Sequence, residues 1–342
     1  MAGPQVHGRS RTQESGQVGD SRAAESGGPP ANSASSSNAA AAGLGDRIAS
    51  RVATRRSQLV LGLDPDPARL WPRALDAGEV GAPPASRAAR AVAAHCELVL
   101  EAAGEQCVAV KLQLACFERL GAPGWAALGV VAEAARDRGL LVIADGKRGD
   151  IGLTASAYGQ ALVAETPTPF GTVAGLGADA VTANPLLGED SLRPLVSAAR
   201  ARGRGVFVLV RTSNPGARDI QEQPLERGGV VSDLLAEIVT RLGADGVGRT
   251  GLADVGAVVG ATAPERLEAL REAMPQAVFL LPGVGPQGGR VEELAPAFAP
   301  GPAGGLITAS RAIVDAHEGG RGDPADAARR EAVRLRELAW TG

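Results

Sequence analysis

VIADGKRGDI, residues 142–151, joins a short apolar run to a cluster of charged residues. Asp145 and Lys147 lie two positions apart, so in an extended strand their side chains point to the same side. Asp150 follows three residues after Lys147. An apolar strand that ends in charged residues is typical of proteins with parallel strands, whose functional groups lie at the carboxyl ends of those strands. The stretch therefore predicts a buried strand with a functional site at its end.

Other short apolar runs of this kind occur along the chain at regular intervals. Each run is continuous rather than alternating, as in strands that are buried on both faces of a sheet. The eight predicted strands are Leu59–Leu63, Val108–Leu112, Leu140–Ala144, Ala178–Thr182, Val206–Val210, Val255–Gly260, Val278–Leu281 and Gly305–Thr308.

Longer stretches rich in Ala, Arg and Glu separate these runs and have apolar residues at helical spacing. In the last stretch, Asp323 suits an N-cap and Pro324 suits the first helical position. Eight β-then-α units in about 300 residues predict a (β/α)8 TIM barrel, and an open doubly wound sheet is the alternative. The other predicted helices are residues 86–103, 124–138, 189–202, 228–242, 264–273 and 288–297.

The composition limits the classes of function. Hydrophobic residues make up 44% of the 342 residues but aromatic residues only 3%, so we expect a core of Ala, Val, Leu and Ile. The net charge of -3 argues against bulk binding of nucleic acid. No apolar run approaches the roughly 18 residues of a membrane span. Three cysteines without C-x-x-C spacing favour a reducing, cytoplasmic location over a disulfide framework or a zinc site.

The first part of the chain differs from the rest. Residues 1–43 are rich in Ser, Ala and Gly and have almost no large apolar residues, which predicts a disordered low-complexity tail. A transit peptide is the alternative. Three arginines within the first 25 residues favour it, and three acidic residues in the same stretch oppose it. We expect residues 44–342 to form one domain.

Nearly every predicted strand has polar residues at its carboxyl end, where the active sites of barrels lie. Alternating Lys and Asp charges there would stabilise one another and keep Lys147 protonated. An ordinary ion-pair cluster at the barrel rim is the alternative for an isolated D-x-K-x-x-D motif. The residues at the strand ends are Asp64, Lys111, Asp145, Asn184, Arg211, Thr262 and Ser310.

Two loops have compositions that suit a phosphate and a heterocycle. Residues 282–289, PGVGPQGG, follow the seventh predicted strand, and Ser310 and Arg311 follow the eighth, where barrels bind phosphate. A helix predicted to begin near Gly289 would point its positive end at this loop. The glycines also match G-x-G-x-x-G, but a dinucleotide fingerprint follows the first strand. Residues 211–216, RTSNPG, could contact the edge of a heterocycle or simply form a turn.

Taken together, residues 44–340 resemble the orotidine 5′-phosphate decarboxylase family, in particular its branch that is common in bacteria such as actinobacteria. The resemblance implies a carboxy-lyase that converts orotidine 5′-phosphate to UMP and CO2, the last step of de novo pyrimidine biosynthesis, without a cofactor or a metal. It also implies a cytoplasmic homodimer that binds neither nucleic acid nor membranes. The motifs that carry it are LGLDPDP (61–67), VKLQLACFE (110–118), ADGKRGDI (144–151), VRTSNPGA (210–217), PGVGPQGG (282–289) and ASRAI (309–313).

The resemblance implies a role for each matching residue. Lys147 would protonate C6 of the pyrimidine, and Lys111 and Asp145 would belong to the charged network around it. Asp150 and Thr154 would reach across a dimer interface into the neighbouring active site. The residues that would contact the ribose, pyrimidine or phosphate are Asp64, Ser213, Gln287, Gly288, Ser310 and Arg311.

Two other functions remain open at this stage. Metal-dependent relatives such as hexulose-phosphate synthase or ketogulonate-phosphate decarboxylase share the Asp-x-Lys-x-x-Asp motif, but Lys111 disfavours a cation at the same place. A catalytically inactive barrel that senses a nucleotide is the second alternative. The presence of Asp145, Lys147 and Asp150 argues against it.

Overall fold

A computed structural model describes residues 42–285, 287–318, 320, 322–340 and 342. The predicted tail, residues 1–43, lies outside the described residues except for its last two positions. Among the residues described, no helix has both the length and the apolar character needed to cross a lipid bilayer.

Within this part of the chain, eight parallel strands close into a barrel, because β1 pairs with both β2 and β10. This closure confirms the predicted TIM barrel and excludes the open sheet. The strands follow one another around the barrel in chain order. They are β1 Leu59–Leu63, β2 Ala109–Gln113, β3 Leu141–Arg148, β6 Ala180–Ala183, β7 Gly205–Arg211, β8 Val255–Val259, β9 Phe279–Leu281 and β10 Gly305–Ala309.

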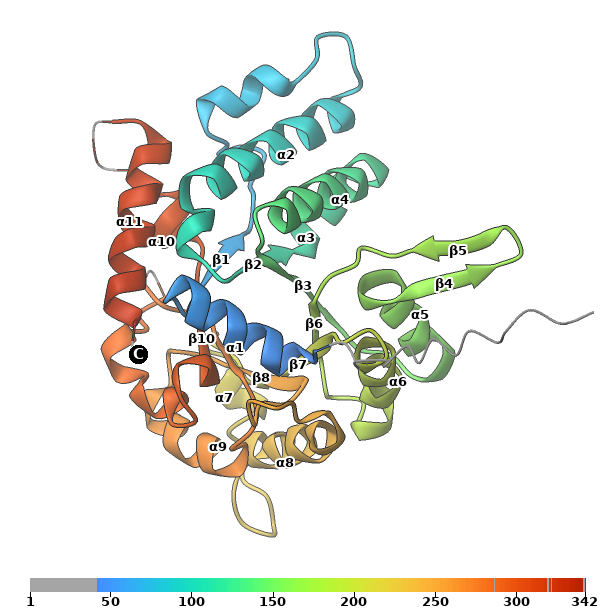
Figure 1. The fold of residues 1–342 in the computed structure, drawn as a ribbon, viewed down its shortest axis with the longest axis vertical. Helices are drawn as coiled ribbons and strands as arrows, with labels where there is room; N and C mark the ends of the chain where they lie inside the picture. Colours follow the sequence, from blue (N-terminus) through green and yellow to red (C-terminus); the bar gives the residue numbers. More distant parts are fainter. Residues whose placement is uncertain (1–41, 286, 319, 321, 341) are drawn as a thin grey trace, which may run out of the picture. The chain divides into compact units, whose positions relative to one another are not determined.

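Helices surround the barrel (Figure 1). The predicted cap of the last helix is confirmed, since the Asp323 carboxylate accepts hydrogen bonds from the Ala325 and Asp326 amides. The long helices are α2 Pro84–Ala103, α4 Ala122–Asp137, α5 Gly152–Val163, α6 Glu189–Arg200, α8 Val231–Gly243, α9 Leu267–Ala273 and α11 Pro324–Ala339. Short helices α3 Leu114–Glu118, α7 Ala217–Ile220 and α10 Arg311–Val314 follow β2, β7 and β10.

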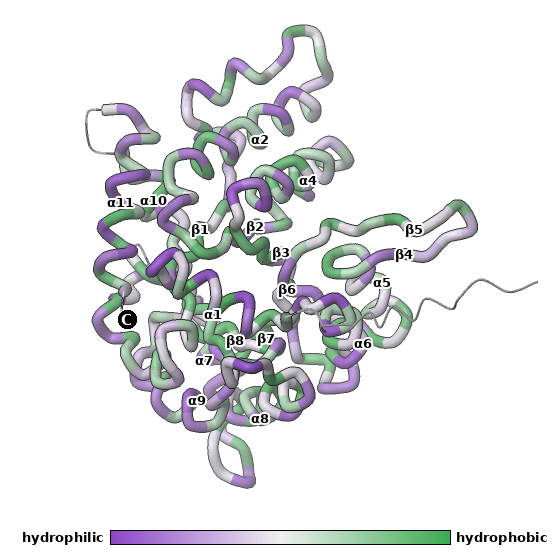
Figure 2. The backbone as a smooth tube through the Cα atoms, viewed as in Figure 1, coloured by the Kyte–Doolittle hydropathy of each residue, from purple (hydrophilic) through white to green (hydrophobic). Residues whose placement is uncertain are grey.

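The core has two layers of aliphatic side chains. One lies between the strands and the surrounding helices. The other fills the inside of the barrel. Figure 2 shows the strands β1, β2 and β8 as largely apolar. Since the strands meet apolar side chains on both faces, their sequences are continuously apolar, which is why they could be recognised.

Helix α1, Leu44–Arg55, packs against the inner layer although no helix was predicted there. Its buried residues Leu44, Ile48 and Val52 recur every four positions, so they form one apolar stripe. The buried Asp46 carboxylate accepts hydrogen bonds from the Thr250 amide and hydroxyl, both at 2.8 Å. The helix thus covers the amino-terminal end of the barrel and leaves the other end open for a site.

The helix predicted over residues 288–297 is wrong. The chain instead forms short 3-10 turns at Val291–Glu293, Ala295–Phe298 and Pro302–Gly304. Pro296 cannot donate an amide hydrogen bond inside a helix, and the preceding glycines do not favour one. The segment consequently offers no helix dipole to the loop before it.

Arg271 holds these turns in place. Its guanidinium is buried and donates hydrogen bonds of 2.7–2.9 Å to the carbonyls of Met274, Ala277, Ala297 and Gly304. Burial lowers the pKa of Arg271 to about 10, which still leaves it charged at neutral pH. A single side chain therefore satisfies carbonyl groups from three separate segments.

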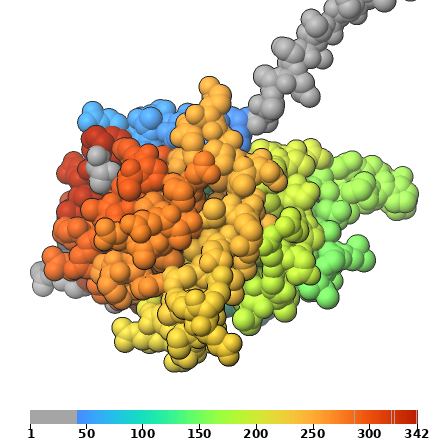
Figure 3. Space-filling model, turned by 90° about the horizontal axis from the view of Figure 1, so that it is seen from below, coloured from blue at the N-terminus to red at the C-terminus, as the bar shows by residue number. Residues whose placement is uncertain are grey.

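A two-stranded hairpin, β4 Glu165–Thr168 and β5 Gly171–Ala174, follows α5 and was not predicted. It projects from the barrel (Figure 1, Figure 3). Phe170 at its turn is 99% exposed. The hairpin has no apolar face buried in the barrel core, so the periodicity that marks the other strands is missing.

We predict that Arg271→Met lowers the free energy of unfolding by about 3 kcal/mol, because four carbonyls lose a charged, buried donor. Urea denaturation followed by circular dichroism measures the change. Arg330→Met on the exposed surface of α11 is the matched control and should change stability by less than about 0.5 kcal/mol. Equal effects of the two substitutions would contradict the role of Arg271.

Candidate active site

A cavity of about 590 Å³ opens at the carboxyl ends of the barrel strands, a volume suited to a nucleotide-sized ligand. Most of the predicted site residues line it. Asp150, Thr154 and Gly288 do not. The predicted residues that the structure brings together here are Asp64, Lys111, Asp145, Lys147, Ser213, Gln287, Ser310 and Arg311.

Four charged side chains form a continuous chain in the cavity. The Lys111 ammonium lies 3.4 Å from an Asp64 oxygen and 2.7 Å from Asp145 Oδ2. The Lys147 ammonium lies 2.7 Å from the other Asp145 oxygen, Oδ1. Since β1, β2 and β3 are neighbours in the barrel, their ends deliver the charges in alternating order. The structure thus brings Lys111, Asp145 and Lys147 together as expected and adds Asp64 to them, whereas Asp150 is not part of this chain of charges.

The electrostatics fix the charge states of the two buried members. Burial works against the charged form of Lys111, but the carboxylates of Asp145 and Asp64 outweigh it and hold its pKa above that of a free lysine. Burial likewise opposes ionisation of Asp145, but the ammonium groups of Lys111 and Lys147 hold its pKa well below the usual range. Asp145 is therefore a carboxylate at neutral pH, clamped between two cations.

Exposure separates the two lysines. The Lys111 side chain is 8% exposed and the Lys147 side chain is 43% exposed. Lys147 can therefore meet a ligand in the cavity, whereas Lys111 mainly supports Asp145. The ammonium of Lys147 is the most accessible positive charge next to the buried carboxylate.

Asp145 and Lys147 lie close together as predicted, but the backbone between them is not the regular extended strand that was expected. Lys147 has φ +48°, which is rare for a residue with a side chain, and the pairing of β3 with β6 is irregular here. The two side chains thus meet across a distorted backbone and not along a regular extended strand. Non-glycine residues in such conformations tend to occur at functional sites.

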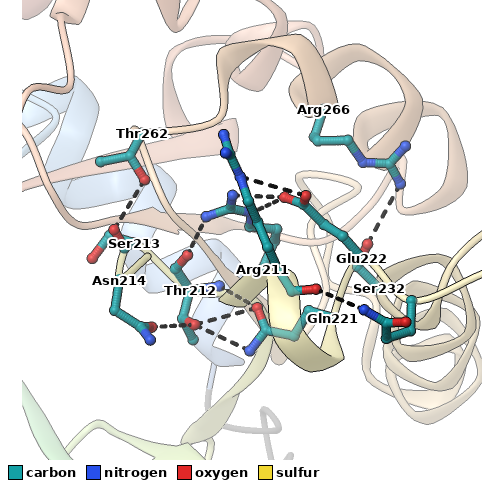
Figure 4. Close-up of polar contacts among 11 residues, drawn as sticks. Arg211, Thr212, Ser213, Asn214, Gln221, Glu222, Ser232, Thr262 and Arg266 are labelled. Carbon is teal, nitrogen blue, oxygen red and sulfur yellow. Dashed lines mark hydrogen bonds and ion pairs between the residues drawn. The ribbon is translucent and has the colours of Figure 1, made fainter. Parts of the chain in front are cut away.

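The loop after β7 is stabilised by its own polar groups (Figure 4). The buried Arg211 guanidinium donates to Glu222, and the Thr212 amide donates to the Gln221 side chain at 2.7 Å. Thr262 donates to the Ser213 carbonyl at 3.1 Å. Arg211 is consequently a structural residue, while the Ser213 side chain lines the cavity.

The loop after β9 is a tight turn. Gly283, Gly285 and Gly288 have φ of +101°, +82° and +94°, so each position favours glycine for its backbone conformation. Gln287 lies in this turn and lines the cavity, as Arg311 does. Because no α-helix begins near Gly289, the predicted helix dipole at this loop is wrong. Side chains, and not a helix end, supply the polar groups here.

Ser310 follows β10 directly and lies in close contact with Gly62 of β1. A Cβ atom built on Gly62 would lie 1.8 Å from Ser310 Oγ. Any larger residue would therefore push Ser310 out of place. Close packing against Ser310 therefore requires glycine at position 62 of the LGLDPDP motif.

Asp150 and Thr154, two of the predicted site residues, lie outside the cavity of their own chain. Thr154 is exposed, and Asp150 lies outside the cavity lining, its carboxylate accepting a hydrogen bond of 2.8 Å from the Ile151 amide. Neighbouring Ile151 and Leu153 are exposed, Leu153 by 87%. Within one chain, these two predicted site residues are not part of the cavity.

The cavity also contains polar residues to which the sequence alone assigned no role. Thr182 bonds to Asp145, and Thr308 has a buried hydroxyl with no hydrogen-bond partner among the described residues. Gln113 and Asn184 also line the cavity. All four lie at the carboxyl end of a strand. Their position was the available signal, but uncharged residues were given less weight than charged ones.

Comparisons with known proteins agree with this geometry. The family model described as "Orotidine 5′-phosphate decarboxylase / HUMPS family" matches residues 57–330. Orotidine 5′-phosphate decarboxylase of Deinococcus radiodurans is 43% identical over 297 residues, covering 85% of this chain and 94% of that protein. The enzyme of the same name from Haloarcula marismortui is 39% identical over 274 residues, covering 80% and 87%.

A solved structure gives the same result at the level of the fold. The OMP decarboxylase of Leishmania donovani superposes with a TM-score of 0.63 at 30% identity, over 88% of this chain and all of that one. The match therefore extends over most of this chain and the full length of that one. The chain belongs to the orotidine 5′-phosphate decarboxylase / HUMPS family.

Proposed function

We propose that this protein decarboxylates orotidine 5′-phosphate to UMP and CO2, the last step of de novo UMP biosynthesis. The observation that carries the proposal is the Asp145 carboxylate held between Lys111 and Lys147 in a nucleotide-sized cavity. The family membership and the curated relatives support the same substrate.

The reaction requires a site that stabilises negative charge on carbon. When the bond between C6 and the carboxylate breaks, its electron pair remains on C6 as a vinyl carbanion. Preorganised positive charge in a partly dry cavity can stabilise this state. Lys147 is the accessible ammonium, so we assign it to face C6 and to donate the proton that gives UMP. The resulting neutral amine then takes up a proton from solvent.

Asp145 has a separate role in the proposal. As an ionised group next to the substrate carboxylate, it would destabilise that carboxylate in the bound state and favour its departure as CO2. Lys111 would keep Asp145 ionised and in place. It also provides the positive charge that a metal would provide in a metal-dependent relative, which supports a reaction without a metal.

The remaining cavity residues are proposed to bind the rest of the nucleotide. Asp64 lies beside Lys111 and could accept a hydrogen bond from a ribose hydroxyl. Ser213 is assigned to the pyrimidine. Arg311 offers a planar pair of donors suited to phosphate oxygens. Gln287 and Ser310 also line the cavity and are assigned to the phosphate as well. Gly288, the neighbour of Gln287, lies outside the lining and is assigned to the phosphate only from the family resemblance.

A homodimer is part of the proposal. Asp150 and Thr154 lie outside the cavity of their own chain, next to the exposed apolar side chains of Ile151 and Leu153. Burying these side chains against a second copy would be favourable. In a two-fold dimer the same contact occurs twice, so each chain would contribute Asp150 and Thr154 to its partner's cavity.

A cytoplasmic location completes the proposal. Cys96, Cys107 and Cys116 are free thiols. Free thiols suit a reducing compartment.

Substitutions of Lys147 test whether it is the proton donor. In EDTA, the purified protein should convert orotidine 5′-phosphate to UMP, measured by ultraviolet absorbance. Lys147→Ala should lose at least about 10³-fold in kcat. Lys147→Arg keeps the charge but holds its proton too tightly to donate it, so it should be similarly inactive.

Two results would contradict this assignment. Retention of more than about a tenth of the activity by Lys147→Ala would remove Lys147 from the chemical step. Activity that appears only on a sugar phosphate with Mg²⁺ would favour the metal-dependent relatives.

Hybrid dimers test whether Asp150 contributes to the partner's cavity. Lys147→Ala and Asp150→Ala should each be nearly inactive as pure dimers. A hybrid dimer, isolated by two affinity tags, should recover about half of the wild-type activity, because one of its two cavities has no substitution.

A hybrid of Lys147→Ala with Lys111→Ala is the matched control, since both lysines line the cavity of their own chain. It should remain inactive. An inactive hybrid of Lys147→Ala with Asp150→Ala would place Asp150 in its own chain's site and contradict the shared arrangement.

A further inference from the structure

Thr182 at the end of β6 connects the two central residues of the cavity. It is 1% exposed and lines the cavity wall. Its hydroxyl accepts a hydrogen bond of 2.9 Å from the Lys147 amide. The same hydroxyl lies 2.8 Å from Asp145 Oδ1. One buried side chain thus touches both the backbone of Lys147 and the carboxylate of Asp145.

The direction of these bonds is fixed by chemistry. A threonine hydroxyl has one proton to donate. The Lys147 amide is a donor and the Asp145 carboxylate is an acceptor, so the proton must point at Asp145. The hydroxyl therefore donates to Asp145 and accepts from the Lys147 amide, and it cannot turn its proton away from Asp145 without losing that bond. Thr182 is further restricted because a β-branched side chain has few χ1 rotamers.

Thr182 links a strained backbone, that of Lys147, to a charged side chain, that of Asp145. Lys147 has the left-handed φ of +48°, a conformation that is unfavourable for a residue with a side chain unless its surroundings hold it. Asp145 Oδ1 accepts from the Lys147 ammonium and from Thr182, while Oδ2 accepts from Lys111. Thr182 is the uncharged donor in this set, so it orients the carboxylate without adding charge to the cavity.

We propose that Thr182 is a positioning residue for the decarboxylation, through its hydrogen bonds to the Lys147 amide and the Asp145 carboxylate. The proposal rests on the function proposed above. Without the hydroxyl, the Lys147 backbone can relax towards an ordinary conformation, and the ammonium moves relative to C6. A displacement of about 1 Å at a reacting group can reduce the rate about 10²-fold.

The test uses Thr182→Val, which keeps the shape of the side chain and removes the hydroxyl. The kcat for orotidine 5′-phosphate should fall about 10²-fold, while KM and the Kd for UMP should change less than about threefold. Thr182→Ser restores the hydroxyl and should recover kcat to within about fivefold of wild type. A general loss of structure would reduce binding and turnover together and would not be rescued in this way.

Thr250→Val is the matched control. Thr250 also donates a 2.8 Å hydrogen bond to a buried carboxylate, that of Asp46, but it lies outside the cavity lining. This substitution should leave kcat unchanged even if it lowers the melting temperature. Should the valine variant at position 182 not fold, Thr182→Ala removes the same hydroxyl without a branched side chain and replaces it.

A second readout does not depend on turnover. The sequence has two lysines, Lys111 and Lys147, so protein labelled with [¹³C,¹⁵N]lysine gives two sets of side-chain NMR signals. Thr182→Val should shift the Lys147 signals, and Thr250→Val should not. Unchanged Lys147 signals, or a kcat within about threefold of wild type, would overturn the role of Thr182. If the wild type fails to decarboxylate, the proposed function fails, while the NMR comparison still tests the link.

Discussion

The whole site depends on the stabilisation of one buried carboxylate. Asp145 is 7% exposed in its side chain, and a charge at that depth is unfavourable unless oppositely charged groups surround it. Lys111, Lys147 and Thr182 together donate hydrogen bonds to both of its oxygens. Each comes from a different position on the wall of a closed barrel, so the carboxylate can stay ionised only when the barrel is correctly assembled. Folding and the preparation of the charged cavity are therefore the same event.

The architecture separates stability from chemistry. At the amino-terminal end, α1 packs aliphatic residues against the inner core. At the carboxyl end, the inner positions of the strands change to charged and hydroxyl-bearing residues. Outside the cavity, side chains hold loops in place by donating hydrogen bonds to backbone carbonyls, as Arg271 does for Met274 and Ala297. Because the rest of the barrel supplies the hydrophobic core, the cavity can contain polar and charged groups that contribute little to that core.

The sequence predicted the barrel and the charged residues because both have local signals. Continuous apolar runs mark strands buried on two faces, and charges at their ends mark the open side of the barrel. The distorted backbone of Lys147 and the link through Thr182 depend on contacts between strands that are distant in sequence. The turns at 291–304 depend on Arg271, which lies 20 residues before the first of them. The hairpin at 165–174 lacks an apolar face in the core, so no periodicity revealed it.

The choice of lysine in the cavity has a consequence for the reactivity of the entire protein. Of 35 Lys and Arg residues, all but Lys111 and Lys147 are arginine, whose guanidinium is a poor nucleophile because it stays protonated. Lys111 is buried, so Lys147 is the only accessible side-chain amine. An acylating metabolite or an amine-directed reagent would find few alternative targets on the surface. Covalent modification of this type would be concentrated at Lys147, the proposed proton donor, and a ligand bound in the cavity would protect it.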